Sequence, residues 1–535
     1  MKNATAILSM LHESPAANSA TRLFRGEPVL RWTLRRIARA AQVKSVAVLC
    51  WEDQLDAVAS EAGTAFVMAK GPRSPLPELD AITAARRWSD GWRGGLLSSC
   101  DFDLGFHGPW FSELSKNVGS DGVLLVDPSA ALVDPSLLDG LITHADAHPE
   151  VELFFVPAAP GLGGALFRTG LLDRLAAAKV HGGRLLHYLP DQLSREPLAG
   201  EGCAPAPTAA ARTTHRFKLD SDRQIARLSA AMISLNGHLA ASGAEELVGR
   251  AQAWSGPDAL PREVVLELNT NRATRPIFWP GAHQSISRPL MGMDCVKRLF
   301  EELSALDDTR LTLAGVGDPL LTDTLFEVLD AARAAGTLCV HIETDFLGAA
   351  PEAIARLAGA AVDIVSVHVP ALTSQTYERM MGTAGYERVL EAIAGFLKAR
   401  QPRRVPILVP TFTKCRENLT EMEPWYDRWL RAVGCAVVRG PSDFAGQIPD
   451  TAVADMAPPK RRPCARLASR LTILCDGRIV SCEQDILGKQ VLGQVGTDSL
   501  AEVWQTRFGK LRGDHRELKL EQRPLCMDCR EWHRP

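Results

Sequence analysis

The feature that most constrains the fold is a cysteine-rich stretch at the end of the 535-residue chain. Cys464 and Cys482 lie on either side of an Asp476-Gly477 pair between two apolar runs, and Cys526-Met-Asp-Cys529 follows. Asp-Gly in this setting is typical of a tight β-hairpin, because glycine accepts the positive φ of the turn. We expect Cys482 at the end of the second strand, and Cys526 and Cys529 on a short loop. The four thiols can then converge on one centre.

Four converging thiolates suit a soft metal ion or an iron–sulfur cluster. The plainer alternative is that these cysteines are buried and pack as small hydrophobic side chains. A CxxC among polar residues is not the usual setting for such packing. A zinc ribbon normally has two CxxC pairs, and this chain has one. The pattern therefore favours an iron–sulfur cluster over zinc.

Composition and charge exclude several other classes. The formal net charge of −3 argues against a general nucleic-acid binder. No apolar run reaches the length of a membrane span. The apolar start of the chain, Ala4–Leu11, predicts a first β-strand and no signal peptide. The twelve cysteines form no disulfide framework for a chain this long, so we expect a reducing cytoplasm.

Residues 1–257 predict a doubly wound α/β domain, because short apolar runs alternate with helical patterns. The expected strands are Ala4–Leu11, Ser45–Cys50, Gly122–Val126 and Val151–Val156. The expected helices include Pro28–Gln42, Pro135–His144 and Arg223–Gln252. The loop-like stretch Trp254–Pro261 interrupts this pattern and places a domain boundary after residue 257.

Residues 258–455 predict a parallel sheet curled into a partial barrel. The expected strands are Val264–Leu268, Leu311–Ala314, Val340–Ile342, Ile364–Val369 and Pro406–Val409, each followed by a helical pattern. Repeated βα units place a site at the C-terminal ends of the strands. Residues 456–535 form the expected small cysteine-rich subdomain.

The C-terminal segment resembles the SPASM/twitch extension of radical SAM enzymes over roughly the last seventy residues. The matching positions, in chain order, are Ile473, Gly477, Cys482, Asp485, Gly493, Val495, Ser499, Leu500, Trp504, Cys526 and Cys529. The resemblance implies one auxiliary [4Fe–4S] cluster bound by Cys464, Cys482, Cys526 and Cys529. Cys475, expected on the first hairpin strand, is the rival ligand.

The preceding barrel resembles the radical SAM core. Its matching stretches are Glu267–Arg272, Gly315–Leu321 and Thr344-Asp345. The resemblance implies that Gly315 and Gly317 allow SAM to approach the backbone closely and that Asp318 accepts a hydrogen bond from its amine. The alternative for Asp318 is a helix cap.

The three thiolates that hold the SAM-binding cluster of that family, in the pattern CxxxCxxC, have no counterpart here. Their positions read Ala273, Ile277 and Pro280, none of which can ligate iron. Phe278 and Trp279 add bulk at the same place. His283, just beyond, would supply one ligand of three. We therefore predict that the chain does not cleave SAM.

The N-terminal domain resembles cytidylyltransferase-like sugar-nucleotide transferases, which have a GT-A-like fold. Arg22 and Arg25 stand in the loop that holds the triphosphate in that family, and Asp220 stands at its second metal position. The first metal position falls on Ser129, with Asp127 two residues earlier. Mg²⁺ bound to a triphosphate normally needs two carboxylates. We expect weak nucleotide binding at best, and Asp127 and Asp220 have turn capping as their plainer role.

The leading hypothesis is a cytoplasmic iron–sulfur protein with a degenerate radical SAM barrel, a pseudoenzyme linked to surface-glycan or sugar-nucleotide metabolism by fold analogy. One alternative is an active radical SAM enzyme with atypical cluster ligands. Another is an active nucleotidyltransferase with a structural C-terminal half. The expected partners are a small molecule or nucleotide-sugar and a redox or modification partner protein.

Overall fold

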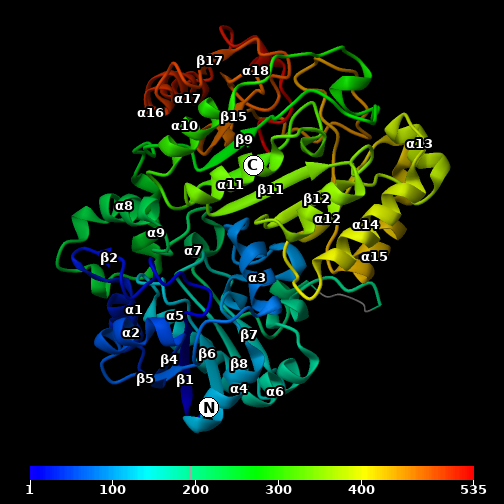
Figure 1. Ribbon diagram of the computed structural model, residues 1–535. Helices are drawn as coiled ribbons and strands as arrows, with labels where there is room; N and C mark the ends of the chain where they lie inside the picture. The colour runs from blue at the N-terminus through cyan, green and yellow to red at the C-terminus, as the bar shows by residue number, and fades with distance from the viewer. Residues whose placement is uncertain (192–195, 535) are drawn as a thin grey trace. The chain divides into compact units, whose positions relative to one another are not determined.

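The computed structural model describes residues 1–191 and 196–534 and separates into two compact units, Met1–Gly256 and Pro257–Pro535. Both units are built from parallel strands with helices between them, which confirms the predicted α/β class (Figure 1). Among the described residues, no helix has both the length and the apolarity needed to cross a bilayer.

Unit 1 contains a six-stranded sheet in the order β5-β4-β1-β6-β8-β7. Strands β1, β4, β5 and β6 run parallel, while β8 runs antiparallel to both of its neighbours. The chain leaves β1 for β4 on one side and later places β6 on the other side. This creates a topological switch point between the carboxyl ends of β1 and β6, where α/β sheets commonly bind ligands.

The elements of unit 1 have the following bounds. The sheet strands are β1 Ala4–Ser9, β4 Val43–Cys50, β5 Phe66–Ala69, β6 Gly122–Leu125, β7 Leu153–Phe155 and β8 Ala165–Arg168, and a separate ribbon pairs β2 Leu23–Phe24 with β3 Glu27–Pro28. The helices are α1 Val29–Ile37, α2 Leu55–Glu61, α3 Pro77–Arg87, α4 Gly108–Asn117, α5 Pro135–Ala147, α6 Thr169–Ala178, α7 Thr208–Arg212, α8 Asp222–Ala231 and α9 Ala244–Ala253.

Strand β1 separates the two hydrophobic cores of unit 1. Ala6 and Leu8 pack into the core that contains residues of α1 and α5, whereas Ile7 packs into the core that contains residues of α4 and α6. Successive side chains of a strand point to opposite faces of the sheet. A strand buried on both faces reads as a continuous apolar run, which is why the sequence revealed β1 clearly.

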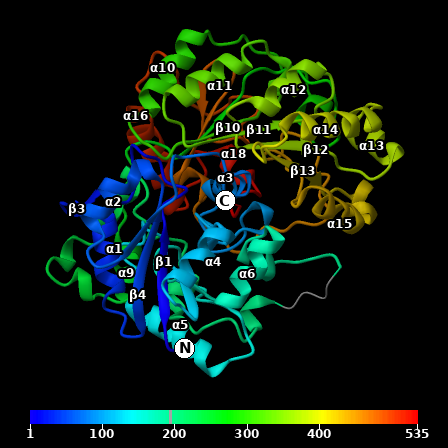
Figure 2. The same cartoon turned by 60° about the horizontal axis from the view of Figure 1, so that its bottom comes forward.

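Unit 2 contains a nine-stranded sheet in the order β14-β13-β12-β11-β10-β9-β15-β16-β17. The six barrel strands are parallel, and β15 adds to them in parallel beside β9. Strands β15, β16 and β17 then form an antiparallel ribbon. Helices α10, α11 and α12 lie along one side of β10 and β11 (Figure 2).

The elements of unit 2 have the following bounds. The strands are β9 Glu263–Leu266, β10 Arg310–Leu313, β11 Cys339–Thr344, β12 Ile364–His368, β13 Ile407–Thr413, β14 Val437–Arg439, β15 Arg470–Ile473, β16 Arg478–Val480 and β17 Val491–Gln494. The helices are α10 Met293–Leu303, α11 Leu325–Ala334, α12 Pro351–Gly359, α13 Ser374–Met381, α14 Tyr386–Arg400, α15 Met422–Val433, α16 Leu500–Glu502, α17 Phe508–Arg516 and α18 Pro524–Asp528.

Three local expectations differ from the structure. Strand β15 ends at Ile473, so Cys475 lies in the hairpin connection rather than on a strand. The CxxC pair begins on the short helix α18 rather than on a loop, because Pro524 is preset for the first helical position. The expected helix Arg223–Gln252 is broken into α8 and α9, and Gly237 between them adopts a left-handed backbone with φ 86°.

Trp504 ties the C-terminal ribbon to the start of unit 2. Its side chain is 1% exposed, and its indole nitrogen donates to the carbonyl oxygen of Asp258 at 3.1 Å. We expect Trp504→Ala to lower the free energy of unfolding of unit 2 by roughly 3–5 kcal/mol, because a large cavity is left. Denaturant unfolding of the full chain measures this. Trp504→Phe, which keeps most of the ring, is the matched control and should cost clearly less. An alanine variant as stable as the wild type would contradict this role.

Candidate functional site

The structure brings the four predicted cluster cysteines to the lining of one cavity in unit 2. Cys464 precedes a short turn of 3₁₀-helix, Cys482 follows β16, Cys526 lies in α18, and Cys529 directly follows that helix. Three separate parts of the chain thus supply the thiols, as the hairpin pattern predicted. Elements β15, β17, α17 and α18 gather in the same region of the unit (Figure 1).

The cysteine thiols are close enough to affect one another's ionisation. Burial raises the pKa of Cys526 to about 12, and the neighbouring Cys529 and Cys464 add to the increase. Burial also raises the pKa of Cys482, with contributions from Glu483 and from Cys526. Free thiolates are therefore disfavoured here. A bound cation that stabilises thiolates would remove this penalty, which fits a donor set of four sulfur atoms to a metal centre.

The surroundings of the cavity also fit a bound group. Ser481 Oγ and His515 Nε2 are buried and have no hydrogen-bond partner among the described residues, and both residues line the cavity. Arg461 donates to the carbonyl oxygens of Cys529 at 2.8 Å and Cys526 at 2.6 Å. These bonds fix the CxxC backbone. The four-cysteine set therefore has both a rigid support and unsatisfied polar atoms facing the position of a ligand.

Cys475, the rival ligand, has a different environment. It lies outside the cavity lining, and its backbone N–H donates to Glu267 Oε1 at 3.2 Å. Burial and the Glu267 carboxylate raise the pKa of its thiol to about 12. Asp485, the acidic residue of the pattern, accepts from the backbone N–H groups of Lys489 and Gln490 at 2.8 and 2.7 Å. Its role is to shape the connection from Cys482 to β17.

At the carboxyl ends of the barrel strands, Arg272 forms the centre of a buried ionic network. Its guanidinium binds both carboxylate oxygens of Asp345 at 2.8 and 2.9 Å and lies 4.8 Å from the ring centre of Trp279. It also donates to the carbonyl oxygens of Val316 at 3.3 Å and Gly317 at 3.4 Å. The expected SAM-binding strand end is therefore occupied by a side chain of the protein itself.

Asp345 is held ionised by this network. Burial opposes ionisation, but Arg272 and His368 outweigh it and lower the pKa of Asp345 to about 2. His368 Nδ1 lies 3.0 Å from Asp345 Oδ1, and Arg439 lies 2.8 Å from His368 Nε2. An arginine can only donate, so His368 accepts at Nε2 and carries its proton at Nδ1. The network is internally satisfied as it stands.

The other predicted SAM contacts already have protein partners. Asp318 is 1% exposed and accepts from the backbone N–H groups of Leu320 at 3.0 Å and Asp345 at 2.9 Å. A Cβ atom on Gly315 would lie 2.5 Å from Glu267, and one on Gly317 would lie 2.2 Å from the Asn269 side chain. Both glycines thus make room for neighbouring protein side chains.

The side chains beside the expected thiolate positions are packed against other residues of unit 2. Phe278 is 2% exposed within the barrel core. Trp279 donates to the carbonyl oxygen of Val316 at 3.1 Å and packs edge-on against Phe444. His283, the nearest alternative ligand, has Nε2 at 2.7 Å from the carbonyl oxygen of Ile277.

In unit 1, Ser129 and Asp127 meet a buried lysine. The Ser129 hydroxyl and backbone N–H both approach Asp127 Oδ1, at 2.5 and 2.8 Å. Lys218 Nζ lies 2.5 Å from the second oxygen of Asp127. Asp220, the other expected metal ligand, forms an ion pair with Arg216. Both carboxylates therefore have protein cations as partners.

The two expected phosphate-binding arginines are also engaged. Arg22 binds Asp222 at 2.8 Å, and Arg25 donates to the carbonyl oxygen of Met232 at 2.5 Å. The structure places them beside α8 and the turn that follows it. Neither contact tests whether a triphosphate binds here, so nucleotide binding stays a prediction.

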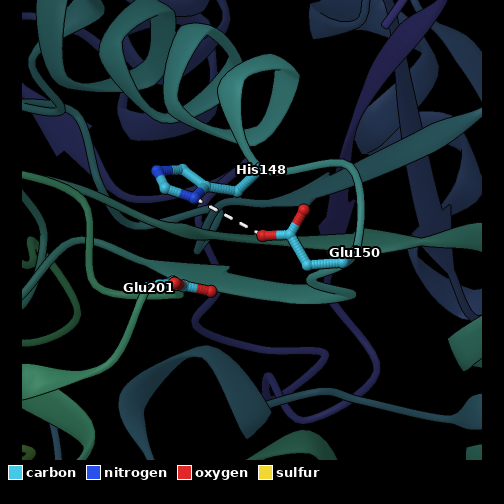
Figure 3. Close-up of side chains that lie close together, drawn as sticks. All are labelled: His148, Glu150 and Glu201. Atoms are coloured by element: carbon cyan, nitrogen blue, oxygen red, sulfur yellow. Dashed lines mark ion pairs between the residues drawn. The ribbon is translucent and has the colours of Figure 1, made fainter.

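One group of potential metal-ligating side chains in unit 1 was not predicted from the sequence. Among the described residues, His148, Glu150 and Glu201 offer ligand atoms within 4.8 Å of one another. His148 and Glu150 point toward each other, with Nδ1 to Oε1 at 3.5 Å (Figure 3). The side chain of Glu150 is 59% exposed. Exposed carboxylates are well solvated by water alone, so this group by itself defines no metal site.

Sequence reasoning also missed Arg272 and Lys218 as central residues. Arg272 lies four residues after the expected first barrel strand, and Lys218 lies two residues before Asp220. One hint of this role was present in the sequence, because a basic residue stands within each stretch that resembles a family motif: Arg272 in the radical SAM-like stretch and Lys218 in the transferase-like stretch. Only the fold shows that these cations pair with buried carboxylates.

Comparison with known proteins supports the cysteine-rich part of this description. Residues 464–530 match the SPASM family, described as an iron-sulfur cluster-binding domain. An uncharacterized protein of Treponema pallidum (strain Nichols) is 26% identical over 273 residues, which cover 48% of this chain and 74% of that protein.

Two solved structures are similar to about half of the chain. BtrN in complex with AdoMet and 2-DOIA is 17% identical, with a TM-score of 0.36 over 50% of this chain and 93% of BtrN. Streptococcus suis SuiB bound to the precursor peptide SuiA is 12% identical, with a TM-score of 0.40 over 54% of this chain and 80% of SuiB. Both TM-scores are below 0.5, so we draw no functional conclusion from them.

Replacing a cluster cysteine tests the metal centre. We expect the wild-type chain, purified without oxygen, to contain about four iron and four sulfide, and Cys526→Ala or Cys482→Ala to lose most of both. Iron and acid-labile sulfide analysis measures this. Cys475→Ala is the matched control and should keep its iron, because this residue lies outside the cavity lining. Stoichiometric zinc without iron, from iron-replete cells, would contradict the expectation.

Glu13 gives a pH-dependent prediction for unit 1. Burial raises its pKa to about 7, although Ser19 donates to it from both its N–H and its hydroxyl. A raised folded-state pKa means that its stabilising contribution is present below about pH 4.5 and is lost as the pH rises to about 7. Glu13→Gln should therefore unfold with a free energy about 1–2 kcal/mol higher than wild type at pH 8, and with a similar value near pH 5.

Denaturant unfolding of the full chain at both pH values measures this difference. Glu27→Gln is the matched control, because Arg35 lowers the pKa of that exposed carboxyl. The control should gain no stability at pH 8. A Glu13→Gln variant that is no more stable than wild type at pH 8 would show that the carboxylate is adequately solvated.

Proposed function

We propose that this chain is an iron–sulfur protein that binds one [4Fe–4S] cluster at Cys464, Cys482, Cys526 and Cys529 and does not cleave SAM. The match of residues 464–530 to an iron–sulfur cluster-binding family supports the first half of the proposal. One observation supports the second half. The Arg272 guanidinium binds Asp345 and donates to the carbonyl oxygens of Val316 and Gly317, in the strand end where the resemblance places SAM.

When bound, an iron–sulfur cluster supplies one-electron transfer or a structural cross-link. The cysteines of this chain would hold it from three separate segments. Arg461 positions the CxxC carbonyl groups and lies 5.2 Å from the ring centre of Trp532, which is 5% exposed. Both residues line the cavity that the four cysteines share.

The barrel offers no set of iron ligands at the degenerate motif. Ala273 and Ile277 end in hydrocarbon, and Pro280 has neither a side-chain donor atom nor a backbone N–H. The His283 ring is already close to a backbone carbonyl group. We therefore favour the pseudoenzyme over an active radical SAM enzyme with atypical ligands. A role in surface-glycan or sugar-nucleotide metabolism rests on the resemblance of unit 1 and stays a prediction.

The test is a search for reductive SAM cleavage. We expect dithionite-reduced, cluster-loaded protein to form no 5′-deoxyadenosine from SAM, by chromatography, because no second cluster can form. Arg272→Ala should remain inactive as well, although it frees the carbonyl oxygens of Val316 and Gly317 to bind SAM. Iron analysis on the same samples confirms that the SPASM site is loaded.

Multiple turnovers in the wild-type protein would overturn the proposal. Loss of that activity in His283→Ala, with the iron at the four cysteines unchanged, would then identify an unexpected ligand. A wild-type protein that holds no iron would instead overturn the cluster assignment, and the two failures are therefore distinguishable.

A further inference from the structure

Unit 1 contains a buried charged chamber at its topological switch point. A cavity of about 40 Å³ lies there, lined by Ser9 at the end of β1, Asp127 beyond the end of β6, Asp101, Trp92 and the glycine-containing loop 158–164. This volume has room for about three water molecules. The chamber is therefore polar and small, and it occupies the place where α/β sheets commonly hold a ligand.

Lys218 supplies the positive charge of this chamber. Its side chain is 3% exposed, and Nζ lies 2.5 Å from Asp127 Oδ2 and 3.3 Å from Asp101 Oδ1. Asp220 is also close enough to raise the pKa of Lys218, against the effect of burial. One ammonium group thus lies between two carboxylates, those of Asp127 and Asp101, and such a pair of carboxylates suits a hard divalent cation.

The backbone around Lys218 fixes this position. The N–H of Phe217 donates to the carbonyl oxygen of Pro160 at 2.7 Å, and the N–H of Leu219 donates to that of Ser129 at 2.9 Å. Residues 217–219 are thereby held on both sides by the loops that line the chamber. Phe217 and Leu219 are fully buried. The backbone position of Lys218 beside these carboxylates is therefore fixed by its two neighbours.

We infer that Lys218 takes the place of a divalent metal ion between Asp101 and Asp127, so that unit 1 holds a latent cation site closed by a tethered ammonium group. A nucleotidyltransferase-like fold implies Mg²⁺, and the residues present do not fit it. Lys218 uses Asp127 Oδ2, Ser129 uses Asp127 Oδ1, and Arg216 pairs with Asp220. A second cation at the same place would be repelled by Lys218.

The charges around the chamber also disfavour the binding of an anionic ligand. Because each carboxylate already has a protein cation nearby, a triphosphate would add negative charge that nothing in the chamber offsets. We therefore expect this chamber to bind neither Mg²⁺ nor a Mg²⁺–nucleotide complex while Lys218 is present. This inference is independent of the cluster and of SAM cleavage.

The test is to remove the ammonium group and look for the metal. Mn²⁺ is the probe, because it prefers oxygen ligands and its free form is measured directly by electron paramagnetic resonance. The full chain is used with its cluster in the oxidised state. All variants carry Glu150→Gln and Glu201→Gln, which remove the exposed carboxylates beside His148.

We expect the Lys218→Ala variant to bind about one Mn²⁺ at least about tenfold more tightly than the protein that retains Lys218, because Asp101 and Asp127 are left without the cation between them. Adding Asp127→Asn to Lys218→Ala should abolish the gain. Lys218→Arg should behave as the wild type, since it keeps the positive charge. Lys116→Ala, which removes a surface lysine paired with Asp173, is the control for loss of any lysine.

Thermal unfolding keeps the test decisive if Lys218→Ala is unstable. Millimolar Mn²⁺ should raise the Tm of that variant and leave the Tm of the Lys218-containing protein unchanged, because a ligand of the folded state stabilises it. The inference is overturned if Lys218→Ala gains neither Mn²⁺ binding nor a Tm increase. It is equally overturned if the Lys218-containing protein binds one Mn²⁺ that Asp127→Asn abolishes.

Discussion

The buried ion pair between Glu267 and Arg288 is the contact on which the arrangement of unit 2 depends. Both side chains are 4% exposed. Glu267 also accepts from the backbone N–H groups of Val316 and Cys475, at 2.9 and 3.2 Å, and Arg288 donates to the carbonyl oxygen of Ile486. One pair thus joins the end of the first barrel strand to the next strand end, to the hairpin and to the segment after Cys482. A buried charge without its partner is costly, so these four segments are held as one structure.

The sequence predicted the elements whose signals are local. Strands such as Ile364–His368 read as apolar runs, and the helical pattern expected after this strand is the helix Ser374–Met381, which Thr373 caps at its start and Gly382 ends. The Asp-Gly hairpin was also found. The short edge strand Val437–Arg439 was missed, since all three of its residues are only partly buried and it carries little apolar pattern. The pairing of β15 with β9 is a contact between distant parts of the chain and leaves no local trace.

For the candidate sites too, only the features that are local in the sequence could be predicted. The sequence identified the cysteines because thiolate chemistry depends on residue type and spacing, and the fold then brought them to one cavity. It also predicted that the thiolate ligands of a SAM-binding cluster are missing. It could not show how nearby charged side chains pair, because that depends on tertiary packing. In the barrel, Arg272 binds Asp345 at the expected SAM-binding strand end, and in unit 1 Lys218 pairs with Asp127.

The parallel pairing of β15 with β9 has a consequence for the order of folding. Arg470 and Glu263, opposite each other in these strands, form an ion pair at 2.8 Å across 207 residues of chain. During synthesis, β9 can pair with β10 early, but its other edge must wait until the C-terminal ribbon has left the ribosome. An open strand edge is a template for pairing with other chains. The nascent protein therefore passes through an interval in which a molecular chaperone covering that edge would protect it from aggregation.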